Sequence, residues 1–165
     1  MDTQKREQIL ALLEKDSRLA PAEVAVLTEL DCKEVEEEIK KMEQERLICG
    51  YHALINWEKT DDNKISAMIE LKVTPQRGDG FDKIAEKIYN YPEVEALYLV
   101  SGGYDFLVIL KKATMKEIAH FVSSKLATID EVQSTATHVL LNRYKEFGIN
   151  IYETPKKDTR MVVTP

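Results

Sequence analysis

Between residues 65 and 73 every second side chain is apolar, which is the period of a β-strand with one buried face. The apolar members are Ile65, Ala67, Ile69, Leu71 and Val73. Before this stretch the apolar side chains recur instead at the three- and four-residue spacing of helices. The change of period predicts two parts, a helical first part over residues 1–57 and a second part built on a sheet. The polar run 58–63 is the expected linker between them.

The second part, residues 64–145, has the pattern β-α-β-β-α-β, which predicts a ferredoxin-like domain. Strands are expected at 65–73, 94–100, 105–111 and 132–141. The first helix has an apolar face of Phe81, Ile84, Ala85 and Ile88, and Pro92 ends it. The second has an apolar stripe of Met115, Ile118, Ala119, Val122 and Leu126. Together with the helical first part, this order predicts an α+β chain.

Right-handed connections place both of these helices on the same face of the sheet, so the other face lacks a cover. Strands 94–100 and 105–111 are apolar on both sides, and such a face does not meet water comfortably. We therefore expect at least a homodimer with sheets packed face to face. The alternative is that the tail, 146–165, covers this face. Residues 150–152 and 161–163 of the tail are candidates for short added strands.

The first part, 1–57, reads as three short helices followed by a hairpin. Helices are expected from Thr3 to Lys15, from Pro21 past Leu27, and from Asp31 to about Arg46. At the start of the third helix, Asp31 and Glu34 have the spacing of a capping box. Residues 47–50 and 51–57 are expected to form two short strands. This arrangement fits a winged helix-turn-helix, and it fits other small helical modules almost as well.

Composition narrows the class of protein. Apolar residues make up 44% and charged residues 32% of the 165, which suits a chain with real cores and a water-exposed surface. No apolar run has the length needed to cross a membrane, and the first residues lack the features of a signal peptide. The two cysteines, Cys32 and Cys49, make no disulfide framework. We expect a cytoplasmic protein that does not bind membranes.

Four segments resemble the Lrp/AsnC, or feast/famine, family of transcriptional regulators. They are Arg6–Glu14, Glu43–Tyr51, the hairpin Leu99–Leu107 and Ile129–Thr137. The likeness covers roughly residues 3–145 in register, and the order and separation of the segments make it specific. The resemblance implies a winged helix-turn-helix that binds DNA, homodimers that assemble into larger homo-oligomers, and an amino acid or related effector bound between C-terminal domains.

The charge of the third helix departs from what this resemblance implies. Residues 1–57 hold eight Lys or Arg and thirteen Asp or Glu, a net charge of −5, whereas domains that grip phosphates are usually basic. Residues 32–46 carry a net −2. We interpret the glutamates as a solvated face and expect DNA contacts from other side chains. The candidates for DNA contact are Lys33, Lys40, Lys41, Arg46 and His52.

The effector is expected at the Ser101–Asp105 turn. An amino acid presents a carboxylate and an ammonium side by side, so its site needs free backbone N–H groups and a negative partner. The candidates are Ser101, Gly102, Gly103, Tyr104 and Asp105, and the resemblance adds Thr135 and Thr137 on the last strand. A structural explanation is equally available, in which the glycines make the turn and Asp105 caps it.

Catalysis and metal binding find little support in the sequence. The three histidines, His52, His120 and His138, fall in three different elements, and no nucleophile motif or glycine-rich phosphate loop is present. Siroheme decarboxylases share the two-domain plan, but the chain lacks their cluster of His, Asn and Tyr. We expect no enzyme, metal or cofactor. The alternative to a DNA-binding regulator is an oligomeric ligand-binding or scaffolding protein. Its acidic first part, residues 1–57 (the head), would then not bind DNA.

Overall fold

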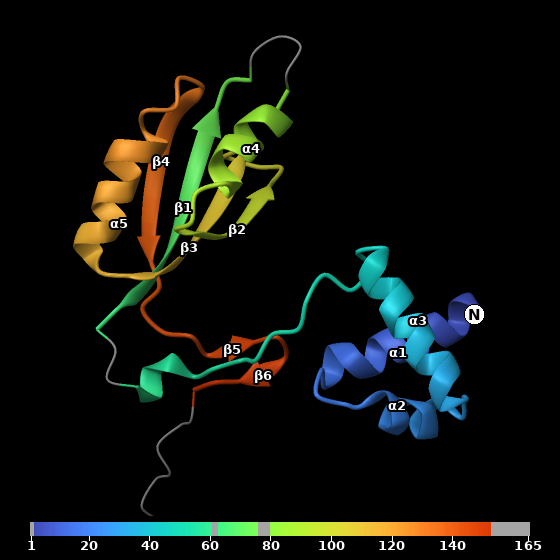
Figure 1. The fold of residues 1–165 in the computed structure, drawn as a ribbon. Coiled ribbons are helices and arrows are strands. Elements are labelled where there is room, and N and C mark those ends of the chain that lie inside the picture. Colours follow the sequence, from blue (N-terminus) through green and yellow to red (C-terminus); the bar gives the residue numbers. More distant parts are fainter. Residues whose placement is uncertain (1, 61–62, 76–79, 153–165) are drawn as a thin grey trace, which may run out of the picture. The chain divides into compact units, whose positions relative to one another are not determined.

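A computed structural model of the chain describes residues 2–60, 63–75 and 80–152 (Figure 1). The chain divides into two compact units between Ile55 and Asn56. None of the described helices combines the length and the apolar composition that crossing a bilayer requires.

The first unit contains three helices, α1 (Thr3–Lys15), α2 (Pro21–Thr28) and α3 (Cys32–Gln44). The expected helix starts are confirmed. Asp31 caps α3, since its carboxylate accepts hydrogen bonds from the backbone N–H groups of Lys33 (2.9 Å) and Glu34 (3.2 Å). The reciprocal bond expected from Glu34 to the Asp31 N–H does not form among the described residues. That bond occurs instead at α2, where the Ala20 N–H donates to Glu23 at 2.8 Å.

The three helices enclose a small apolar core. Its buried members are Ile9, Leu13, Val24, Ala25, Val35, Ile39 and Met42. In α3 they follow the expected i, i+4, i+7 spacing of Val35, Ile39 and Met42, so that one stripe of the helix faces inward. The opposite stripe of α3 is therefore turned to solvent.

The two short strands expected at 47–50 and 51–57 are wrong, because the described chain forms no strand there. The backbone N–H groups of Leu47 and Ile48 both donate to the Met42 carbonyl, at 2.9 and 3.1 Å, and so close the end of α3. Arg46 makes the necessary bend in the left-handed region, with φ of 59°. The segment beyond is held to α3 by the Tyr51 hydroxyl, which donates to Glu43 at 2.8 Å.

The second unit begins with a short 3-10 helix, η1 (Trp57–Lys59), and its main body is a four-stranded antiparallel sheet. The strands are β1 (Ile65–Val73), β2 (Val94–Leu99), β3 (Phe106–Ala113) and β4 (Val132–Val139). Their order is β2-β3-β1-β4, as Figure 1 shows. The helices are α4 (Asp82–Tyr89) and α5 (Met115–Phe121), and α5 continues into the π-helical turn η2 (Val122–Leu126). The predicted β-α-β-β-α-β order is confirmed.

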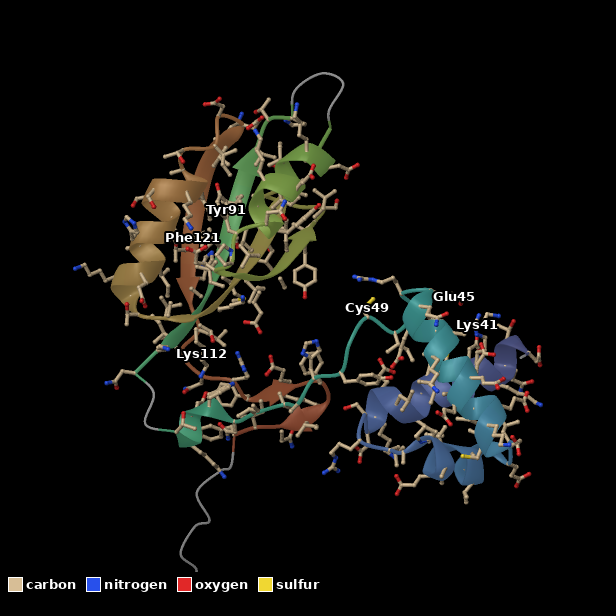
Figure 2. All side chains as sticks on the ribbon, viewed as in Figure 1. Lys41, Glu45, Cys49, Tyr91, Lys112 and Phe121 are labelled. Atoms are coloured by element: carbon tan, nitrogen blue, oxygen red, sulfur yellow. The ribbon has the colours of Figure 1, made fainter. Side chains whose placement is uncertain are left out.

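Both helices pack on one face of the sheet. The core joins inward side chains of β1 and β3, among them Ile69 and Phe106, to Ile84 and Ile88 of α4 and Ile118 of α5. The stripe expected on α5 was partly wrong. Met115 and Ala119 are exposed, and Phe121 takes the inward place, with its ring 5.6 Å from that of Tyr91 (Figure 2).

The other face of the sheet is uncovered by the described residues. Its members include Met68, Glu70, Tyr98, Leu107, Ile109, Ala136 and His138. The central ones are half-buried by their neighbours, whereas Tyr98 on the edge strand is 54% exposed. On this open face His138 Nε2 of β4 lies 3.3 Å from Glu70 Oε1 of β1. The open face is thus mainly apolar, with one polar contact between these two strands.

After β4 the chain forms a separate hairpin of β5 (Lys145–Glu146) and β6 (Ile149–Asn150). The hairpin is tied to the start of the same unit, because Asn56 Nδ2 donates to the Ile151 carbonyl at 3.3 Å. Of residues 150–152, expected as an added strand, only Asn150 lies in β6, and β6 pairs with β5 rather than with the four-stranded sheet. The second candidate, 161–163, lies outside the described residues.

Candidate functional site

The solvent-facing stripe of α3 holds a smaller share of acidic residues than residues 32–46 as a whole. Lys33, Glu37, Lys40 and Gln44 lie at i, i+4, i+7 and i+11, opposite the buried stripe, and all four are exposed. Only one of the four is an acid. The six acidic residues of 32–46 are therefore not spread evenly over the surface that a partner would meet.

Glu38 is the main correction to the expected solvated face, because it is only 7% exposed. Arg6 of α1 reaches across to α3, where its Nε lies 2.7 Å from Glu38 Oε1 and its Nη2 lies 2.6 Å from Glu45 Oε2. The hydrogen bond from Arg6 lowers the pKa of Glu45. One acid of α3 and the acid that directly follows the helix are thus paired within the first unit. Arg6 carried no signal in the sequence, because its partners lie more than thirty positions away.

Two of the predicted DNA contacts are engaged in ion pairs along α3. Lys40 Nζ lies 2.7 Å from Glu36 Oε1, and this pairing lowers the pKa of Glu36. Lys41 Nζ lies 3.9 Å from Glu45 Oε1, and Figure 2 shows both residues at the C-terminal end of α3, where Glu45 is the residue after the helix. Such exposed i, i+4 pairs are weak and exchange readily for other partners. Lys33 makes no side-chain ion pair among the described residues.

Arg46 and His52 follow α3 rather than belong to it. Both are exposed. Since the expected hairpin is missing, His52 lies on a segment that is neither helix nor strand, and not on a wing. Lys33, Lys40 and Lys41 therefore lie together on α3. Arg46 and His52 lie on the segment that follows this helix.

The Ser101–Asp105 turn connects β2 to β3. The Val100 N–H donates to the Asp105 carbonyl at 2.8 Å and closes the turn. Asp105 also continues the pairing with β1, since its N–H donates to the Leu71 carbonyl (2.9 Å) and its Oδ2 accepts from the Val73 N–H (2.8 Å). One oxygen of the Asp105 carboxylate is thus already bonded to β1. Oδ1 has no hydrogen-bond partner within the described chain.

Neither Gly102 nor Gly103 is required by the fold of a single chain. Both are exposed, neither adopts a positive φ, and a Cβ built on either would meet nothing within 4 Å. The space beside these glycines is open to a ligand or to another chain. This differs from Gly148, whose φ of 79° favours glycine.

Thr135 and Thr137 lie in register with residues of the core. Thr135 is opposite Leu71, which is itself opposite Phe106, so that Thr135 shares an end of the sheet with the Ser101–Asp105 turn. Thr137 is opposite Ile69, one row further along. Because directly opposed residues share a face, both threonines are directed to the helix-covered side. The open face receives Ser134, Ala136 and His138 from β4.

A pocket that the sequence did not indicate lies between α4 and the edge strand β2. Its volume is about 270 Å³, and its apolar lining includes Phe81, Ala85, Leu97 and Leu99. Two acids, Asp82 and Glu95, also line it. No pattern predicts the pocket, because it arises from the way one helix lies over a strand edge. Among the described residues, no three His, Cys, Asp or Glu side chains gather as metal ligands would.

Comparison with known proteins identifies this arrangement. The family described as the Lrp/AsnC ligand binding domain matches residues 66–149. The HTH-type transcriptional regulator YugG of Bacillus subtilis is 44% identical over 164 residues, which cover 99% of this chain and 98% of that one. The chain belongs to the Lrp/AsnC family. It is a ligand-responsive transcriptional regulator of the helix-turn-helix type.

Other Lrp/AsnC proteins agree with this assignment. The leucine-responsive regulatory protein of Haemophilus influenzae is 25% identical, over 84% of this chain and 83% of its own. The leucine response regulatory protein of Mycobacterium tuberculosis matches in fold with a TM-score of 0.72 at 22% identity, covering 92% of this chain and all of that one. A Neisseria meningitidis regulator solved with L-methionine matches with a TM-score of 0.68 at 23% identity, covering 88% and 93%. The predicted fold class and family are confirmed.

Proposed function

We propose that this Lrp/AsnC regulator binds DNA through the solvent-facing stripe of α3 and binds an amino acid or a related small metabolite beside the Ser101–Asp105 turn. The observation that carries the proposal is that Arg6 pairs with the buried Glu38 of α3 and with Glu45 at the end of the helix. With Glu38 and Glu45 held by Arg6, the outer stripe presents Lys33 and Lys40 to the phosphates.

The remaining DNA contacts follow from the same geometry. Lys41 can exchange its long contact with Glu45 for a phosphate, and Arg46 and His52 continue the basic surface past the end of the helix. Glu37 is the one acid in the outer stripe, and a carboxylate there accepts a hydrogen bond from cytosine rather than holding a phosphate. DNA binding of this kind gains from two heads joined in one homo-oligomer.

For the effector, the proposal rests on Asp105 Oδ1 and on the open space at Gly102 and Gly103. A ligand ammonium would pair with Oδ1 while Oδ2 keeps its bond to the Val73 N–H. A ligand carboxylate would meet backbone N–H groups of Ser101, Gly102 or Gly103, with Tyr104 beside them and the Thr135 hydroxyl at the same end of the sheet. Thr137, one row away, would contact only a longer ligand.

The homodimer is proposed on the open face of the sheet. Its half-buried apolar side chains, with the exposed Tyr98, form an apolar surface of the kind that monomers rarely leave in water. A second copy would present the same surface, so that the pairing is isologous.

A salt series of DNA binding tests the proposal. We would measure the affinity for the DNA upstream of the protein's own gene between 50 and 200 mM salt, a range over which phosphate contacts change affinity by orders of magnitude. Lys33→Ala should weaken binding and reduce the slope of log K against log salt by about 1, the effect of losing one phosphate contact. Lys116→Ala, an exposed lysine of α5, is the control and should change neither quantity.

The alternative is an oligomeric ligand-binding or scaffolding protein whose acidic head does not bind DNA. It is favoured if the wild-type chain fails to bind at low salt while Glu37→Lys binds. Glu37 is the appropriate site for this reversal because it is exposed in the outer stripe. Reversal of the buried Glu38 would disrupt the contact with Arg6 instead.

A second experiment separates the effector role of Asp105 from its structural role. Asp105→Asn keeps an oxygen that can accept from the Val73 N–H but removes the negative charge. L-Methionine, the ligand of the Neisseria regulator, is the first probe, followed by the other common amino acids. We expect a rise in Tm for the wild-type chain with one of them and no rise for Asp105→Asn, whose Tm without ligand stays close to the wild type. An equal rise in both would exclude Asp105 as the ammonium partner.

A further inference from the structure

The β5–β6 hairpin displays an aromatic side chain at its tip. Phe147 is 86% exposed, and it occupies the first position of the two-residue turn Phe147–Gly148. The φ angles of these residues are 45° and 79°, so both are left-handed, as the tight hairpin turn requires. Asparagine, aspartate or glycine usually fills the first position, because a bulky side chain is unfavourable there. The folding of one chain therefore gives no reason for phenylalanine at this position.

The pocket between α4 and β2 has a mainly apolar lining, which includes Phe81, Ala85 and Leu97. Its rim includes Tyr89 and Leu99, each 56% exposed. Its volume of about 270 Å³ exceeds that of an apolar cavity of ~150 Å³ that accepts benzene. The pocket is thus large enough for one phenyl ring. Exposed apolar side chains around it would gain from being covered.

The charges beside the two features are complementary. Asp82 and Glu95 line the pocket and are exposed, whereas the exposed Lys145 stands two residues before Phe147. Arg143, the other cation near the hairpin, is held by Glu146 at 2.9 Å. Lys145 is therefore the cation of the hairpin that is available to an acidic rim.

We propose that Phe147 of one subunit inserts into the α4/β2 pocket of a second copy of the chain, with Lys145 facing Asp82 and Glu95. Within a single chain the two features do not meet, since Phe147 is exposed and the pocket is open. The occupant is a second copy because hairpin and pocket match in size, polarity and charge.

This contact joins two different surfaces and is therefore heterologous, unlike the isologous pairing of open faces. The two contacts use separate parts of the second unit. Leu99 is opposite Phe106 and so is directed to the helix side of the sheet, away from the open face. Subunits paired through their open faces would thus be joined to further pairs by hairpins, and heterologous contacts of this kind close into rings or extend as filaments.

Sedimentation velocity of two variants tests the inference. Phe147→Asn removes the ring and places a residue that tolerates the left-handed turn, so the fold is kept. Leu99→Lys puts a cation at the exposed rim of the pocket, opposite to Lys145 in the proposed contact. Each variant alone should lose the largest species formed by the wild-type chain. A mixture of the two should regain larger species than either forms alone, because each supplies the half that the other lacks.

A charge exchange gives an independent readout. Lys145→Glu should reduce assembly, and Glu95→Lys in the same chain should restore it, which a purely structural effect on the hairpin would not do. Unchanged sizes for both Phe147→Asn and Leu99→Lys would overturn the inference. The inference would also be overturned if each variant forms smaller assemblies but their mixture forms none larger. The hairpin and the pocket would then take part in different contacts. Neither outcome bears on DNA binding, which the salt series measures separately.

Discussion

Met42 and Val26 represent the two extremes of the first unit. Met42 is fully buried among the three helices, whereas Val26 on α2 is 79% exposed. Met42→Ala should lower the free energy of unfolding of this unit by about 2–5 kcal/mol, because it removes core atoms and leaves a cavity. Val26→Ala should change it by no more than about 0.5 kcal/mol. Hydrogen exchange, which reports each unit separately, is the measurement. Equal effects of the two substitutions would contradict the described core.

Glu131 gives the second unit an acid-sensitive contact. Lys87 donates to both carboxylate oxygens, at 2.9 and 3.1 Å, and this lowers the pKa of Glu131. A lowered folded-state pKa adds stability above the unfolded pKa, and that stability is lost as pH falls through the folded value. Glu131→Gln should therefore be less stable than the wild type at pH 7, and the difference should shrink on acidification below about pH 4. Urea unfolding at several pH values checks this. A difference that grows on acidification would have the wrong sign.

Residue-scale details were the least predictable from the sequence. Glu38 was expected in a solvated face, and its actual partner, Arg6, lies on another helix. The resemblance placed Thr135 and Thr137 on the last strand, and only the pairing with β1 shows that both are directed to the helix-covered face. Both details depend on the partner across the fold, which the local spacing of residues does not report.

Elements were predicted well where a local signal marks their start. Asp31 begins α3 and Pro21 begins α2 as expected, because caps and proline act on the residues beside them. The alternation at 65–73 gave β1 with its bounds unchanged. The expected strands at 47–57 failed because two N–H groups needed for pairing close α3 instead. Nothing in the apolar pattern of that segment distinguishes these two uses.

The helix caps allow a paired prediction. Thr114 caps α5 reciprocally, since its Oγ1 accepts from the Glu117 N–H at 3.3 Å and its own N–H donates to Glu117 at 2.7 Å. Thr114→Ala should cost about 1 kcal/mol. At α2 the cap position is Ala20, which has extended backbone angles but no side-chain acceptor. Ala20→Ser should therefore stabilise the first unit by roughly 0.5–1 kcal/mol. Hydrogen exchange in α5 and α2 measures both, and effects of the same sign would contradict this account of the caps.

At the scale of the whole molecule, the net charge of −6 and the acidic first unit gave a poor guide to function. In the first unit the fold buries one acid of α3 and pairs others with basic side chains. The outer stripe of α3 is left with both basic and acidic residues. The sheet contributes the other half of the account. In the proposed homodimer, pairing through its open face would bring two DNA-binding units to one stretch of DNA.

The open face is tested most simply by placing a charge in it. Ile109 is opposite both Met68 and Ala96 and is half-buried in one chain. Ile109→Glu should separate paired subunits, because a carboxylate buried between two apolar sheets is unpaired. The exposed Val26→Ala, in the other unit, should leave the pairing unchanged.

Sedimentation equilibrium at low micromolar concentration, carried out on the Phe147→Asn chain to isolate the face-to-face contact, is the most direct measurement. Pairing through the open faces gives a mass of at least twice 18.9 kDa, which Ile109→Glu should reduce to that of a single chain. A Phe147→Asn chain that sediments as one folded subunit of 18.9 kDa would contradict it.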